Sequence, residues 1–199
     1  MATSETGSWG GSIRSRLRAE TEELHRTLEH RLDLLGPGLG RARYLRVLCA
    51  FLGYYASLEE RLAAAPSDLP PPPWSARLHA DLRALGLSHD AIGSLPRCTV
   101  LPPLEGRAHR AGCLYVLEGA ALGGRVIARE LKLRLGIEPE AGAAFFAGEG
   151  AATGERWGRF LGWLEGQAVA CAADDEIVDA ARATFRTFGD WLDRRGALR

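Results

Sequence analysis

The sequence LYVLEGAALGGRVIAREL, residues 114–131, decides what kind of fold this chain can form. Its apolar residues recur every three or four positions, which is typical of an α-helix with one buried face. Gly119, Gly123 and Gly124 interrupt this pattern, and each glycine inside a helix costs about 1 kcal/mol relative to alanine. Two explanations are open: close packing of a small-residue stripe on another helix, or a bend that brings bare backbone against a flat ligand.

The same helical spacing extends over most of the chain. No stretch alternates with period two over the length of a strand, and β-branched residues are few. The sequence therefore predicts an all-α protein. The expected helices cover approximately residues 12–35, 42–65, 74–85, 90–95, 107–135, 155–172 and 174–194.

One domain is expected to account for the chain. A length of 199 residues fits a single domain, and 46% hydrophobic with 25% charged residues is typical of a globular protein. Residues 1–11 are small and polar and are expected to form a flexible N-terminus, followed by a single domain over residues 12–199. The segment PSDLPPPPW, residues 66–74, is expected to be a stiff extended connection within that domain.

Charge and cysteine content narrow the possible functions. The 25 basic and 25 acidic residues cancel, so no net charge would attract nucleic acid or an anionic membrane. No segment resembles a signal peptide, and the longest apolar run, residues 47–58, is shorter than the roughly 20 residues of a membrane span. The cysteines have neither metal-ligand nor haem-attachment spacing. We therefore expect a cytoplasmic protein with free thiols at Cys49, Cys98, Cys113 and Cys171.

The segment LRAETEELHRTLE, residues 17–29, carries the second informative pattern. On a helical wheel, His25 borders the apolar face and His30 faces solvent. A lone histidine in this position is more often a packed side chain than a ligand. However, Glu29 could accept the Nδ1 proton and present Nε2 to a metal, and Arg18 could pair with an anion along the helix. This combination suits an iron porphyrin; the remaining histidines are expected at the surface: His79, His89 and His109.

The two patterns together resemble those of the heme oxygenases, and the resemblance extends over residues 12–192. The segments LGLSHDAIGSLPRC, residues 85–98, and YVLEGAALGG, residues 115–124, look closest to bacterial members that supply biliverdin to bacteriophytochromes. The resemblance implies a single-domain helical fold. In that fold, heme lies between a proximal helix with the axial histidine and a kinked distal helix with glycines.

The resemblance also implies the site residues. His25 matches the axial iron ligand, Glu29 its hydrogen-bond partner and Arg18 a propionate contact. The distal glycines, which are expected to act in catalysis, are Gly119, Gly123 and Gly124. Weaker expected heme contacts are Tyr115, Arg156 and Arg159, with a solvated position as the alternative for the two arginines. Six aromatic residues are expected mainly in the core, with some beside the heme: Phe145, Phe146, Trp157, Phe160, Phe185 and Phe188.

One position departs from the family pattern. Many relatives have an aspartate directly after the first distal glycine, whereas this chain has Ala120. Glu118, one position before that glycine, is expected to point elsewhere. Proton delivery would then depend on backbone carbonyls and ordered water.

The activity implied by the resemblance is oxidative cleavage of heme b to biliverdin, carbon monoxide and ferrous iron. Heme is then both cofactor and substrate, and the expected partners are dioxygen, an electron donor such as a ferredoxin or a reductase, and a bacteriophytochrome as bilin acceptor. One alternative is a non-degrading heme carrier or sensor on the same fold. Another is thiamine-pyrimidine hydrolysis, which needs a cysteine nucleophile with a base, and neither Cys113 nor Cys171 has an evident one.

Overall fold

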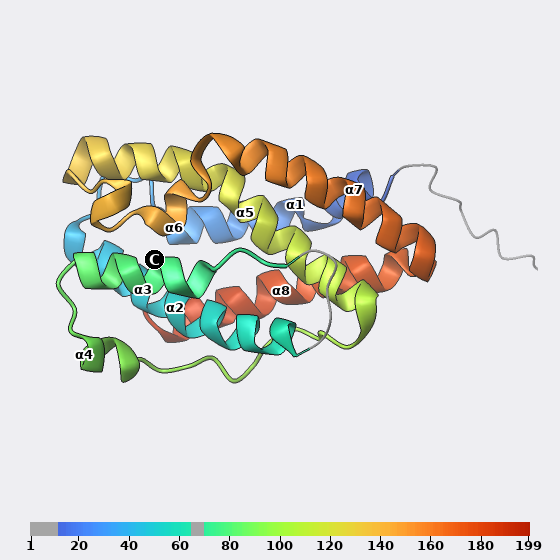
Figure 1. Cartoon of the computed structure of the whole chain (residues 1–199), viewed down its shortest axis with the longest axis horizontal. Coiled ribbons are helices and arrows are strands. Elements are labelled where there is room, and N and C mark those ends of the chain that lie inside the picture. Colours follow the sequence, from blue (N-terminus) through green and yellow to red (C-terminus); the bar gives the residue numbers. More distant parts are fainter. Residues whose placement is uncertain (1–11, 65–69) are drawn as a thin grey trace, which may run out of the picture.

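The computed structural model describes residues 12–64 and 70–199, and within these ranges it contains helices and no strands (Figure 1). The all-α prediction is therefore confirmed, and each expected helix is present with ends that agree to within a few residues. The expected flexible segment 1–11 and residues 66–69 of the proline-rich connection lie outside the described residues. The helices are α1 (Ile13–Leu32), α2 (Arg41–Ala63), α3 (Trp74–Ala84), α4 (His89–Gly93), α5 (Gly106–Leu135), α6 (Ala144–Ala147), α7 (Thr153–Cys171) and α8 (Asp174–Arg194).

The segment between α5 and α7 is more ordered than its glycine- and alanine-rich sequence suggests. It contains α6 between two 3-10 turns, η1 (Pro139–Ala141) and η2 (Gly150–Ala152). These elements are three or four residues long, too short for apolar periodicity to reveal them. Figure 1 shows α6 between α3 and α5, so this segment closes one side of the bundle.

α5 is the central helix of the core. It packs most extensively along α8 and also contacts α7 and α6. Its length and apolar composition would suffice to cross a membrane, but half of its most apolar window is buried inside the protein. Figure 1 shows that α5 changes direction part way along its length while remaining one continuous helix, which agrees with the expected kink.

α1 is held in the bundle by a few buried residues and by ion pairs to α8. Its buried residues are Ile13, Leu17 and Thr21, all in its first half. Ion pairs connect it to α8 at three levels along its length: Arg16 with Asp175, Glu20 with Arg182, and Arg31 with Asp193. The second half of α1, which carries His25, packs against the core only through partly buried residues: Leu24, Leu28 and Leu32.

Gly112 permits the closest approach between α5 and α8. A Cβ atom on this glycine would lie 2.0 Å from the carbonyl oxygen of Ile177 and 2.9 Å from the Cβ of Ala180. Any side chain here would therefore push the two helices apart.

We expect Gly112→Ala to lower the free energy of unfolding by about 1–3 kcal/mol, because overpacking outweighs the gain in helix propensity. Gly162→Ala in α7 is a matched control, since a Cβ at Gly162 meets no atom within 4 Å. The control should raise stability by up to about 1 kcal/mol. Urea denaturation measures both changes, and a gain in both variants would show that α5 and α8 separate at no cost.

Candidate functional site

A cavity of about 550 Å³ lies between α1 and α5, and its lining is mostly apolar. Its volume falls in the range of roughly 300–1,000 Å³ typical of small-molecule sites. α1 and α5 supply two walls and make little contact with each other. Aromatic residues from α2, α6 and α8 form a third wall: Phe51, Tyr55, Phe145, Phe146, Phe185 and Phe188.

His25 lines this cavity from the second half of α1. Its side chain is 54% exposed, and its ring packs edge-on against Phe185 with the ring centres 5.9 Å apart. An imidazole that is held on one side and open on the other can ligate a metal in the cavity. His30 is exposed, as expected from the helical wheel, and does not line the cavity.

The contact between His25 and Glu29 differs in detail from the expected one. The closest ring nitrogen is Nε2, which lies 3.4 Å from Oε1 of Glu29, whereas the helical spacing had suggested a hydrogen bond from Nδ1. Both side chains are more than half exposed, so packing does not force one ring orientation. Glu29 does line the cavity, as predicted.

Arg18 and Tyr115 line the cavity from opposite helices, α1 and α5. Burial raises the pKa of Tyr115, and the positive charges of Arg14 and Arg18 act in the opposite direction. Tyr115 therefore remains a protonated phenol at neutral pH and can donate a hydrogen bond beside two cations. This group of charges and donors is suited to a carboxylate-bearing edge of a ligand.

Gly119, Gly123 and Gly124 of α5 all line the cavity but have different surroundings. A Cβ atom on Gly123 would meet no atom within 4 Å, and one on Gly119 would make only ordinary contact with Trp157 at 3.6 Å. A Cβ atom on Gly124 would lie 2.6 Å from the carbonyl oxygen of Phe146. Gly124 therefore permits packing on α6, whereas Gly123 leaves cavity space open.

Glu118 is the residue that sequence analysis misplaced. It lines the cavity, is only 3% exposed, and accepts two hydrogen bonds from Arg156: Nε to Oε2 at 2.9 Å and Nη2 to Oε1 at 2.6 Å. A carboxylate inside the apolar run of a core helix is the signal that could have revealed this pair, because a buried charge needs a partner. The partner itself is 38 positions away and could not be identified from helical spacing.

Arg156 lines the cavity as predicted, but its guanidinium is already used by protein groups. It also donates to the carbonyl oxygen of Pro70 at 3.0 Å and lies 3.8 Å from Glu149. Glu149 in turn lies 3.9 Å from Arg77, so the charges at this corner are balanced. Thr153 lies at the same corner, and its buried hydroxyl has no hydrogen-bond partner among the described residues.

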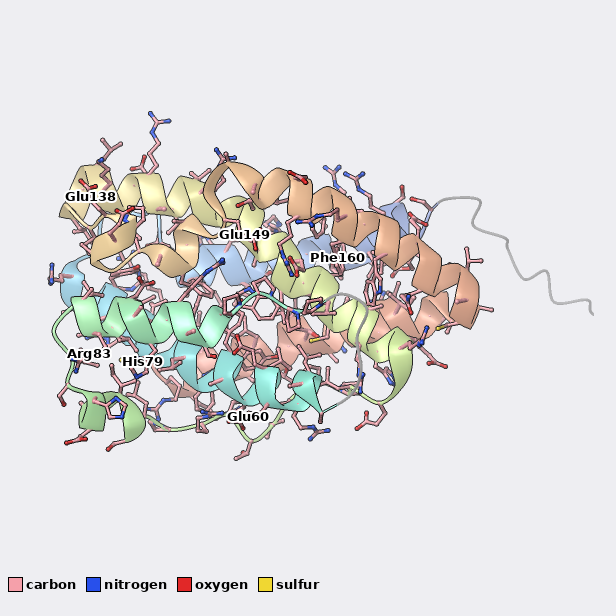
Figure 2. The ribbon with its side chains drawn as sticks, in the orientation of Figure 1. Glu60, His79, Arg83, Glu138, Glu149 and Phe160 are labelled. Carbon is pink, nitrogen blue, oxygen red and sulfur yellow. The ribbon has the colours of Figure 1, made fainter. Side chains whose placement is uncertain are left out.

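Several other predicted residues lie outside the cavity. Arg159 is exposed and does not line it, so its expected heme contact has no support in the structure. Phe160 is completely buried on the inner side of α7, as Figure 2 shows, and serves the core alone. His79 lies on the side of α3 that faces α4 (Figure 2), where its ring is 5.7 Å from that of His89. The other five aromatic residues named above line the cavity: Phe145, Phe146, Trp157, Phe185 and Phe188.

We expect Arg156→Met to lower the free energy of unfolding by about 3–5 kcal/mol, because it leaves the buried Glu118 carboxylate without its counter-charge. The double variant Glu118→Gln/Arg156→Met should recover most of this loss, since the unpaired charge is then absent. Chemical denaturation of the two single variants and the double variant gives the coupling energy. If the losses of unfolding free energy in the two single variants simply add up in the double variant, the pair contributes no buried electrostatic interaction.

Adjacent glycines provide a second test. Gly124→Ala should lower the free energy of unfolding by about 1–3 kcal/mol, because its Cβ meets the backbone of Phe146. Gly123→Val should leave stability almost unchanged, since valine is no worse than glycine in a helix, but should weaken heme binding by filling the open space. Thermal denaturation and hemin titration separate the two effects. Unchanged hemin affinity in Gly123→Val would contradict a role for this glycine in ligand fit.

Comparison with known proteins agrees with the fold. Residues 12–194 match the family model described as Heme oxygenase. A heme oxygenase from Xanthomonas campestris pv. campestris (strain 8004) is 34% identical over 163 residues, which are 79% of this chain and 93% of the relative. The structure of NO- and CO-bound heme oxygenase from Neisseria meningitidis has the same fold, with a TM-score of 0.76 at 21% identity over 94% of each chain. The chain belongs to the heme oxygenase family.

Proposed function

We propose that this enzyme binds heme b in the cavity between α1 and α5 and cleaves it to biliverdin, carbon monoxide and ferrous iron. Family membership supports the reaction. The observation that best supports the site is that His25 and the open position at Gly123 line the same cavity. Heme is the substrate and supplies the iron at which dioxygen and donor electrons react.

The residues of the cavity fit this ligand. His25 would hold the heme iron through an imidazole nitrogen, and its ring packs edge-on against Phe185. The flat, apolar faces of heme match the aromatic wall built by α2, α6 and α8. The two propionates would lie toward Arg18 and Tyr115, where positive charge and a hydrogen-bond donor are available.

The α5 wall acts mainly by leaving space. Gly119 and Gly123 present bare backbone to the cavity, so a small molecule has room between this helix and the ligand. Ala120 offers no carboxylate on this wall. Glu118 lines the cavity nearby, and its two carboxylate oxygens accept hydrogen bonds from Arg156.

The absence of a carboxylate at Ala120 is the observation that favours a second candidate function, a heme carrier or sensor that does not degrade its ligand. The two functions predict different fates of the bound heme when a reductant is added. Addition of ascorbate or a ferredoxin system in air should convert the heme absorption band into a bilin spectrum in the enzyme. Persistent heme without bilin would support the carrier.

The partners and location follow from the proposed reaction. The electron donor is a ferredoxin or a reductase, and a bacteriophytochrome is the acceptor of the bilin. The resemblance of residues 85–98 and 115–124 to bacteriophytochrome-associated members supports the second partner. The four cysteines are free thiols, which agrees with a reducing compartment such as the cytoplasm. Co-expression with an apo-bacteriophytochrome tests the acceptor, since a functional pair should yield the bilin-bound photoreceptor.

The two histidines of α1 provide a direct test of the axial ligand. In His25→Ala the iron loses its nitrogen ligand, so the spectrum should change to that of weakly ligated heme and turnover should collapse. Added imidazole should restore part of both, because the missing group is a small neutral ligand. Absorption spectra of the hemin complex and bilin formation measure the two effects.

His30→Ala is the matched control, since His30 is exposed one turn away and does not line the cavity. It should leave spectrum and turnover unchanged and should alter stability by at most about 0.5 kcal/mol. A histidine-ligated spectrum that survives in His25→Ala and disappears in His30→Ala would overturn the assignment.

A further inference from the structure

Asp81 is a buried carboxylate that does not line the cavity. It lies in α3, is 1% exposed, and accepts two backbone hydrogen bonds from the start of α6. The amide of Ala144 donates to Oδ1 at 2.7 Å, and the amide of Phe145 donates to Oδ2 at 2.8 Å. Burial raises the pKa of Asp81, whereas these two donors and Arg77 oppose that change. Both carboxylate oxygens are thus committed to fixing the first two residues of α6.

α6 connects this carboxylate to the heme site. Phe145 and Phe146 both line the cavity, and the ring of Phe145 packs edge-on against Phe51 at 5.6 Å and Tyr55 at 5.1 Å. The backbone of Phe146 lies against Gly124 of α5. A shift of α6 would therefore move the aromatic wall and remove the support of the glycine-bearing helix.

The segment that precedes α6 is fixed as well. The hydroxyl of Tyr44 in α2 donates to the carbonyl oxygen of Gly142 at 2.8 Å. Gly142 has a φ of 121°, and a Cβ there would lie 2.8 Å from Leu85, so only glycine suits this position. α6 spans only four residues and cannot hold this conformation by itself, so contacts from α2 and α3 must determine it.

We propose that Asp81 is a positioning residue of the heme site: it holds the first two amides of α6 and so sets the aromatic wall against which the porphyrin ring packs. Asp81 acts through Phe145 and Phe146 and touches no ligand. This inference rests on the proposed function, because it requires a porphyrin in the cavity.

Asp81→Asn tests the inference, because one carboxylate oxygen becomes an amide group that cannot accept a hydrogen bond from the backbone. In the heme-free protein, hydrogen exchange followed by NMR should show the amides of Ala144 and Phe145 exchanging about tenfold faster. Zinc protoporphyrin, a fluorescent porphyrin that is not turned over, should dissociate about tenfold faster. The hemin complex should keep its histidine-ligated spectrum, since His25 is unchanged.

Ile92→Ala is the control for a general loss of stability. Ile92 is 4% exposed in α4 and lies away from the cavity, so this variant should melt at a lower temperature but keep wild-type exchange in α6 and wild-type porphyrin dissociation. If Asp81→Asn does not fold, Tyr44→Phe releases the Gly142 end of the same segment and should accelerate both rates to a smaller extent.

Faster exchange without faster porphyrin dissociation would overturn the inference and leave Asp81 with a purely structural role. Unchanged exchange would overturn it as well. Failure of the proposed heme binding is distinguishable, because the wild-type protein would then bind neither hemin nor zinc protoporphyrin. Wild-type binding together with an unaffected Asp81→Asn variant refutes the positioning role alone.

Discussion

The close backbone approach of α5 to its neighbours is the constraint on which the rest of the structure depends. Gly112 brings the first half of α5 against α8, and Gly124 brings its second half against α6. Each contact replaces side-chain packing with backbone packing, which requires a glycine at that point. Together they fix the central helix along its length, and every wall of the cavity is arranged relative to it.

The cavity exists because α1, unlike α5, does not pack on its neighbours through close contacts at glycines. The fully buried residues of α1 all lie in its first half, and charged side chains on its flank attach it to α8. α1 and α5 are therefore both anchored to α8 while remaining apart from each other. A cavity remains between them, lined by His25 of α1 and by the open position at Gly123 of α5.

Charge in this cavity is distributed unevenly. At one corner, Glu118 and Glu149 balance Arg156 and Arg77, so those arginines are committed to protein carboxylates. Arg18 instead lies near the phenol of Tyr115. The difference matters for recognition, because an arginine already paired with a buried carboxylate can bind a ligand anion only by giving up that pair.

The sequence by itself determined the long helices and the side of α1 on which His25 lies. These properties follow from a local repeat of 3.6 residues, which is visible in any stretch of ten or more residues. The same repeat separated His25 from His30 and located the glycines of α5. The two patterns that resemble those of the heme oxygenases, residues 17–29 and 114–131, lie on the long helices α1 and α5, which is why the family could be identified from them.

Only the tertiary structure decided which partner each of these residues meets. Gly123 and Gly124 are neighbours in sequence, yet one faces open space and the other faces Phe146, because a rotation of about 100° per residue points them in different directions. Arg156 meets Glu118 instead of remaining free, and Asp81 reaches amides 63 and 64 positions away. Local periodicity carries no information about such distant pairs, because they form only when separate helices are packed together.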